Sequence, residues 1–226
     1  MKSILKKTAI CLLVFSMIIT SGLAAPKKEV HAAQGTYGGR IWKSWVKLRK
    51  SKSKKSKVIR KISKGEPVQV HYTSGKWRKV TYKGKTGFVL KKYVYINTNA
   101  PELSGSQEEK GQTVAAFAQR FVGNPYVWGG TNLNSGADCS GFVGGVYRSF
   151  GYKLPRTSSD LRKAGRKVSY KNKQPGDLIC YSGHVAMYIG NGKIVHASTR
   201  KTGIKISPRA NYRKVVAVRK IGRAHV

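Results

Sequence analysis

The chain has 226 residues, of which 45 are Lys or Arg and only 8 are Asp or Glu, so its formal net charge is +37 at pH 7. This length suits two small domains better than one large core. The charge predicts salt-dependent binding of a polyanion, but no helix-turn-helix, zinc-finger or RNA-binding signature accompanies it, which argues against a specific nucleic-acid partner. The plainer alternative is that the scattered lysines only keep the protein soluble.

The first 32 residues have the pattern of a secretory signal peptide. A basic start precedes an apolar run from Thr8 to Leu23, and Val30-His31-Ala32 supplies small residues at the two positions that a signal peptidase reads. Polar residues interrupt the run, which is shorter than the roughly 20 residues that cross a bilayer. We therefore expect cleavage after Ala32 and a secreted mature protein without a transmembrane segment; a retained anchor is the alternative. Outside the cell, the anionic polymers of a cell wall are the expected polyanions.

Residues 33–98 read as short strands separated by turns. Val68, Val70 and Tyr72 alternate with polar residues, as in a half-buried strand, and Gly75 and Gly84 mark turns on either side of the next apolar segment. The Lys/Ser run 50–57 has no apolar residue to bury, so we expect an exposed loop. About five short strands in sixty residues predict a small all-β barrel.

This segment resembles a bacterial SH3-like domain. The resemblance is carried by four blocks in order: Val46-Lys47-Leu48-Arg49, Ile62–Val68, Gly75–Val80 and Gly84–Val89. It implies a module that binds cell-wall peptide or glycan. Trp42 and Trp45 are the candidates for exposed aromatic side chains, whereas Trp77 is expected in the core.

A linker is expected at 99–110, where Pro, Gly, Ser and acidic residues replace apolar ones, and a second domain at 111–226. Apolar residues at intervals of three and four predict helices at 112–122, from Cys139 to Phe150 and, more briefly, at 158–164. Strands are expected afterwards at 178–181, 185–189, 193–197, 205–207 and 215–221. Helices followed by an antiparallel sheet predict an α+β domain.

Cys139 is the candidate nucleophile, because it lies where a Gly-rich loop gives way to the second helix. Unpaired N–H groups at a helix start favour a thiolate and could also hold an oxyanion. A neighbouring imidazole must accept the thiol proton, and a further polar residue must orient that imidazole. His184 and His196 could fill these two roles. Asp138 is expected to cap the helix.

The hairpin after His184 decides whether the two histidines can meet. With a two-residue loop at Asn191-Gly192, His196 would lie opposite Met187, and His184 would point to the other face. With a three-residue loop at 190–192, His196 would pair with Ala186, and His184 would become its diagonal neighbour on the same face. We predict the second register.

Two alternatives compete with this interpretation of the cysteines. Cys139 and Cys180 could form one structural disulfide in a secreted chain, although we expect free thiols and a buried, structural Cys180. The two cysteines and two histidines could also bind zinc, but they lack a zinc-finger spacing. We expect neither a metal nor a cofactor.

The second domain resembles the NlpC-type (NlpC/p-sixty) cell-wall cysteine peptidases, whose fold is papain-like. The blocks that carry the resemblance are Asn124–Gly130, Asp138–Phe142, Leu154–Ser158, Gln174–Leu178 and Gly183–Gly190 with Val195-His196-Ala197. The resemblance implies Cys139 as nucleophile, His184 as general base and acid, and His196 as its orienter. It also implies substrate-binding roles for Tyr126, Asp138 and Ser140; Asp138 would bind the free amine of a stem peptide.

The resulting hypothesis is a secreted, monomeric peptidoglycan hydrolase. By resemblance it would cleave the stem peptide after γ-D-glutamate through a thioester acyl-enzyme. One alternative is a non-catalytic cationic wall-binding protein, and another is a thiol acyl or amide transferase on the same fold.

Overall fold

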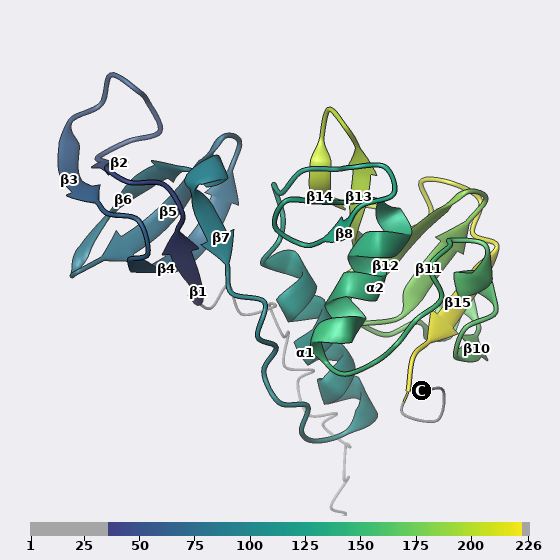
Figure 1. Cartoon of the computed structure of the whole chain (residues 1–226). Helices are drawn as coiled ribbons and strands as arrows, with labels where there is room; N and C mark the ends of the chain where they lie inside the picture. Colours follow the sequence, from purple (N-terminus) through teal and green to yellow (C-terminus); the bar gives the residue numbers. More distant parts are fainter. Residues whose placement is uncertain (1–35, 223–226) are drawn as a thin grey trace, which may run out of the picture. The chain divides into compact units, whose positions relative to one another are not determined.

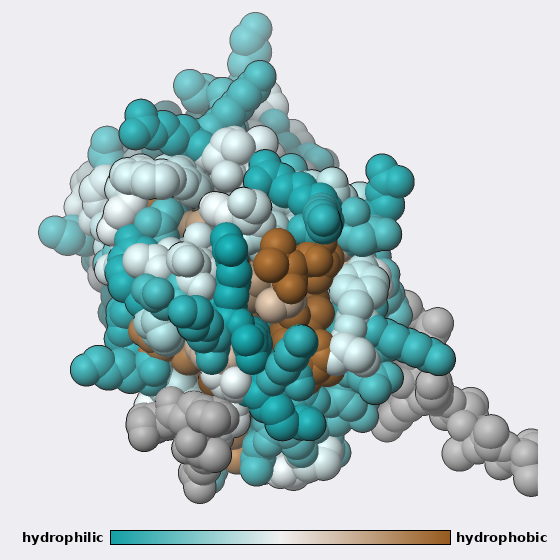
Figure 2. Space-filling view, turned by 90° about the vertical axis from the view of Figure 1, so that its right-hand side faces the viewer, coloured by the Kyte–Doolittle hydropathy of each residue, from teal (hydrophilic) through white to brown (hydrophobic). Residues whose placement is uncertain are grey.

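The computed structural model describes residues 36–222, which comprise an all-β region followed by an α+β region. This combination confirms the predicted fold class. The predicted signal peptide lies outside the described residues. Within residues 36–222, none of the helices has the length and apolar character needed to cross a membrane. Hydrophilic residues cover most of the face seen in Figure 2, as the charge leads one to expect, and the largest hydrophobic patch lies near its centre.

The first region is a seven-stranded antiparallel sheet with the strand order β3-β2-β6-β5-β4-β1-β7. Alternate residues of its strands are buried, including Val70, Val80 and Val89, and these form the core that the period-two pattern predicted. The Lys/Ser run 50–57 is an exposed turn, also as predicted. The strands are β1 (Tyr37–Ile41), β2 (Val46–Arg49), β3 (Val58–Ile62), β4 (Pro67–Ser74), β5 (Trp77–Tyr82), β6 (Lys85–Leu90) and β7 (Val94–Ile96).

The second region packs two helices, α1 (Gln107–Gln119) and α2 (Cys139–Ser149), against a six-stranded antiparallel sheet (Figure 1). Phe142 and Val146 of α2 are fully buried beneath the central strands. The strand order is β10-β15-β11-β12-β13-β14. Its strands are β10 (Arg166–Val168), β11 (Leu178–Tyr181), β12 (His184–Gly190), β13 (Lys193–Thr199), β14 (Gly203–Ser207) and β15 (Ala217–Lys220).

Helix α1 begins at Gln107, five residues before the predicted start at 112. The reason is a capping box: the Glu109 amide donates to Ser106 Oγ at 3.3 Å, and the Ser106 amide donates to Glu109 Oε2 at 2.7 Å. The acidic residues that predicted a linker therefore stabilise a helix start, so the last part of the predicted linker is helical.

The register of the β12–β13 hairpin is the predicted one, but the extra residue sits elsewhere. Met187 pairs with Val195, which puts His196 opposite Ala186. The loop itself has two residues, Asn191 and Gly192, both with positive φ (50° and 71°) as in a type I′ turn. A β-bulge between Tyr188 and Gly190 supplies the shift that the prediction had assigned to a three-residue loop.

Two further elements differ from the prediction. The segment expected as a helix at 158–164 contains only a single 3-10 turn, Asp160–Arg162, whose first amide donates to Thr157 Oγ1 at 3.1 Å. The short strand pair β8 (Thr131–Asn132) and β9 (Gly136–Ala137), which leads into α2, was not predicted. Two-residue strands are too short to carry a periodic signal.

Gly141 in the first turn of α2 should be irreplaceable, because a Cβ at this position would lie 2.0 Å from the Gly130 carbonyl oxygen. We predict that Gly141→Ala lowers the midpoint of thermal unfolding. At Gly144, in the same helix, a Cβ would have open space within 4 Å. Gly144→Ala should therefore raise the stability by up to about 1 kcal/mol through helix propensity. Equal effects of the two substitutions would contradict the close contact between the Gly130 carbonyl and Gly141 of α2.

Candidate active site

Cys139 is the first residue of α2, and its side chain is almost fully buried, with 9% of its surface exposed. The backbone N–H of Val185 in β12 donates to the Cys139 sulfur, which places the thiol beside the strand that carries His184. The N–H groups of Cys139 and Ser140 also face the sulfur. Burial nevertheless outweighs these donors and raises the pKa of the Cys139 thiol above its ordinary value.

His184 and His196 meet across the β12–β13 hairpin. Nε2 of His184 lies 2.8 Å from Nδ1 of His196, and the ring centroids are 5.0 Å apart with an interplanar angle of 76°. Their exposed fractions are only 8% and 1%. Because Nε2 of His184 is engaged, Nδ1 is the ring nitrogen of His184 that remains for a proton from the thiol. The structure therefore brings the two predicted histidines together.

Two aromatic rings pack against this imidazole pair. Tyr181 stacks on His184 with centroids 5.9 Å apart, and Tyr212 packs against both Tyr181 and His196 at 5.3 and 5.7 Å. Burial, reinforced for His184 by Arg213 and for His196 by its histidine partner and nearby cations, lowers the pKa of His184 to about 4 and that of His196 to about 3. Both rings are therefore neutral at pH 7.

The sequence led us to expect that the start of α2 favours a thiolate, and the structure differs on this point. A raised thiol pKa and a lowered imidazole pKa both favour the neutral pair in the unliganded protein. The physical cause is burial, which disfavours either charged form and which the sequence does not reveal. Burial therefore opposes a preformed thiolate–imidazolium pair in the unliganded protein.

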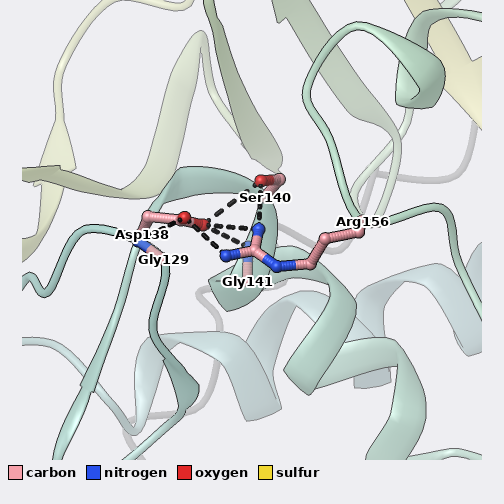
Figure 3. Close-up of polar contacts among 5 residues, drawn as sticks. All are labelled: Gly129, Asp138, Ser140, Gly141 and Arg156. Carbon is pink, nitrogen blue, oxygen red and sulfur yellow. Dashed lines mark hydrogen bonds and ion pairs between the residues drawn. The ribbon is translucent and has the colours of Figure 1, made fainter.

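Asp138, Ser140 and Arg156 form a polar cluster beside the nucleophile (Figure 3). Arg156 donates to both carboxylate oxygens of Asp138, at 3.1 and 2.7 Å, and to Ser140 Oγ at 2.9 Å. Although burial opposes it, this guanidinium, with the amide of Gly141 at 2.7 Å, holds the pKa of Asp138 below its ordinary value. Asp138 is the N-cap of α2, as predicted, and it also accepts the Gly129 amide at 3.0 Å.

Tyr126 and Cys180 were also considered in the sequence, and the structure places them as follows. Tyr126 is joined to Ala137 by a parallel bridge, so it lies at the entrance to α2. Burial raises the pKa of Tyr126, and the neighbouring Cys139 and Asp138 raise it further. Cys180 is fully buried in β11, and Asp177 accepts the Gln174 amide at 2.8 Å, so both are structural.

Cys139 and Cys180, the cysteines among the described residues, are free thiols. Among residues 36–222, no cluster of three or more His, Cys, Asp or Glu side chains has the geometry to hold a metal ion.

Three residues near the site were missed as candidates. Arg156 lies in the Leu154–Ser158 block that carries the family resemblance, but no role was assigned to it. Tyr212 carried no signal of its own, because a single Tyr in a loop is usually a surface residue. Ser207, in β14, places its Oγ 2.9 Å from Nε2 of His196. It fell within a predicted strand, but the loop between β13 and β14 has no turn signature that would have fixed its register against His196.

The rate of alkylation of Cys139 by iodoacetamide should report the neutral pair directly. Because the thiol pKa is raised and the pKa of His184 is lowered to about 4, we predict that the rate climbs steadily with pH from 6 to beyond 9. A Cys139→Ser variant measures the background from the buried Cys180. A rate that is already at its plateau between pH 5 and 7 would instead show a preformed ion pair.

Comparison with known proteins gives two matches along the chain. The family model of the NlpC/P60 family matches residues 123–219, and that of the bacterial SH3 domain matches residues 44–95. A Bacillus subtilis protein named bifunctional muramidase/DL-endopeptidase CwlT is 36% identical over 117 residues, covering 48% of this chain and 35% of that protein. A Bacillus cereus γ-D-glutamyl-L-lysine dipeptidyl-peptidase is 38% identical over 96 residues, covering 39% of this chain and 28% of that protein.

Among solved structures, the NlpC/p60 domain of the peptidoglycan hydrolase SagA is 30% identical, with a TM-score of 0.44. That match covers 49% of this chain and 98% of the solved domain. By contrast, the chain spans only about a third of the length of the two Bacillus relatives described above.

Proposed function

Because residues 123–219 belong to the NlpC/P60 family and residues 44–95 to the bacterial SH3 domains, we propose that the protein is a secreted cysteine endopeptidase of peptidoglycan. The bond cleaved would be the one after γ-D-glutamate in the stem peptide. The observation that carries this proposal is the buried, hydrogen-bonded pair His184–His196, together with the backbone of Val185, next to His184, at the Cys139 sulfur. The named activities of the relatives, which include DL-endopeptidase and γ-D-glutamyl-L-lysine dipeptidyl-peptidase, support it.

The first step is attack of the Cys139 sulfur on the scissile carbonyl carbon. The thiol proton moves to Nδ1 of His184 as the C–S bond forms, and the carbonyl electrons move onto the oxygen. The N–H groups of Cys139 and Ser140, at the positive end of α2, are the candidates for stabilising that oxyanion. His184 then returns its proton to the leaving amine, and a thioester remains on Cys139. Water, deprotonated by the same ring, hydrolyses the thioester.

Substrate binding would involve Asp138, Tyr126 and Ser140. The second domain has three acidic residues, and the other two are committed elsewhere: Asp160 bonds with Thr157 at 2.6 Å, and Asp177 is buried. Asp138 is therefore the acid that could bind the free amine of a stem peptide. Its bidentate bond to Arg156 leaves a net neutral pair, so a bound amine would share the carboxylate with the guanidinium.

Replacing Cys139 tests this proposal. We predict that Cys139→Ala abolishes cleavage of purified muropeptides, because the other described thiol, Cys180, is fully buried in β11, while binding to insoluble cell wall persists. Mass spectrometry of the digest identifies the bond and separates hydrolysis from acyl transfer. Undiminished cleavage by the Cys139→Ala variant would refute the mechanism, and an inactive wild type that binds the wall would make the protein a binding module only.

The all-β region supplies the proposed wall affinity through a groove that contains Trp45. Trp45 is 69% exposed and has a positive φ of 58°, a conformation that costs energy for a bulky residue. Trp77, which was expected in the core, is only half-buried and lines the same groove together with Tyr93. The remaining lining includes four cationic side chains: Lys43, Lys47, Arg49 and Lys54. Aromatic faces beside cations suit the sugar rings and acidic groups of a wall polymer.

Trp45→Ala should weaken sedimentation of the inactive Cys139→Ala protein with purified cell wall, by several-fold at low salt. The matched control is Tyr72→Ala, which removes another exposed aromatic side chain of the same sheet from outside the groove. Binding to walls stripped of anionic polymers measures how much charge contributes to the affinity. The electrostatic contribution should also disappear as salt is added. Equal wall binding by the Trp45 and Tyr72 variants would rule out the groove as the binding site.

A further inference from the structure

Ser207 is a buried hydroxyl that the proposed reaction does not yet use. It is 7% exposed and lies at the end of β14, where its Oγ is 2.9 Å from Nε2 of His196. His196 is 1% exposed, so water cannot readily replace this partner. Ser207 therefore continues a chain of hydrogen bonds that runs from His184 through His196.

The direction of this chain follows from the chemistry of the first ring. To accept a proton from the Cys139 thiol, His184 must keep Nδ1 free and carry its own hydrogen on Nε2. That hydrogen is donated to Nδ1 of His196, which lies 2.8 Å away. Since a neutral imidazole has one N–H, His196 must then carry its hydrogen on Nε2. The acceptor for that hydrogen is Ser207 Oγ.

We propose that Ser207 is a positioning residue that fixes the tautomer of His196 and, through it, the tautomer of His184. The proposal rests on the proposed function only in its kinetic consequence. Without an acceptor at Nε2, a hydrogen on that nitrogen would be buried without a partner. The tautomer of His196 with its hydrogen on Nδ1 would then have the lower free energy. Two N–H groups would then face each other, and His184 would have to move its own hydrogen to Nδ1. In that form His184 cannot accept the thiol proton.

The groups packed around His196 offer no substitute for Ser207. Lys205, its cross-strand partner on β14, is a donor only, as is Arg213 in the following segment. The ring of Tyr212 is tilted by 50° to that of His196, at a centroid distance of 5.7 Å, and burial raises the pKa of Tyr212. His184, from β12, already occupies Nδ1. Ser207 is therefore the neutral acceptor that the described residues place at Nε2.

The test compares three variants of the full chain: Ser207→Ala, Ser207→Thr, which retains a hydroxyl, and Ile206→Ala, a control at an exposed neighbour on the same strand. We expect Ser207→Ala to lower kcat on muropeptides roughly 10- to 100-fold with little change in KM, as loss of an orienting partner typically does. Ser207→Thr should recover most of the lost kcat, and Ile206→Ala should keep it. Thermal unfolding shows whether each variant is folded.

Nitrogen NMR of the histidine rings supplies a readout that does not depend on activity. At neutral pH the wild type should show both His184 and His196 with hydrogen on Nε2, and Ser207→Ala should shift His196 toward the Nδ1–H form. A Ser207→Ala variant with unchanged kcat and an unchanged His196 tautomer would overturn the proposal. If the wild type itself cleaved no muropeptide, the proposed function would be wrong, and the NMR comparison would still decide the role of Ser207.

Discussion

The hydrogen bond between the buried imidazoles of His184 and His196 is the interaction on which the site depends. It exists only because the β-bulge between Tyr188 and Gly190 shifts the hairpin by one residue, so that both rings project from the same face of the sheet. Without the bulge, the tight Asn191-Gly192 turn would put the rings on opposite faces. The bulge thus allows the hairpin to keep a tight two-residue turn and still have the register that places both histidines on one face.

Burial sets the electrostatic character of the site. It lowers the pKa of both histidines and raises that of the Cys139 thiol, so the unliganded site holds neutral groups within a chain of very high positive charge. The carboxylate nearest the nucleophile, that of Asp138, is paired with Arg156 in a bidentate contact. Even so, the negative charge of Asp138 adds to the burial that raises the pKa of the Cys139 thiol.

Much of this could be predicted from the sequence, because the signals were local or strongly patterned. The helix that starts at Cys139, the strands on either side of the Asn191-Gly192 turn and the order of an all-β region before an α+β region all follow from periodicity, caps and turns. The start of α1 was missed because Ser106 and Glu109 fit a linker as well as a capping box. The contact of Ser207 with His196 and the pairing of Arg156 with Asp138 were not predicted, because they depend on long-range packing that no local pattern encodes, even though Arg156 lies in a block that marks the family.

In the proposed reaction, Cys139, with a neutral imidazole beside it, forms a covalent thioester with a stem peptide. The most direct measurement is mass spectrometry of the protein quenched in acid during its first turnover of a purified muropeptide. We predict that the peptide containing Cys139 gains the mass of the acyl fragment, and that the adduct disappears as product accumulates. Product formation with no adduct on Cys139 at any time, or an adduct on another residue, would contradict it.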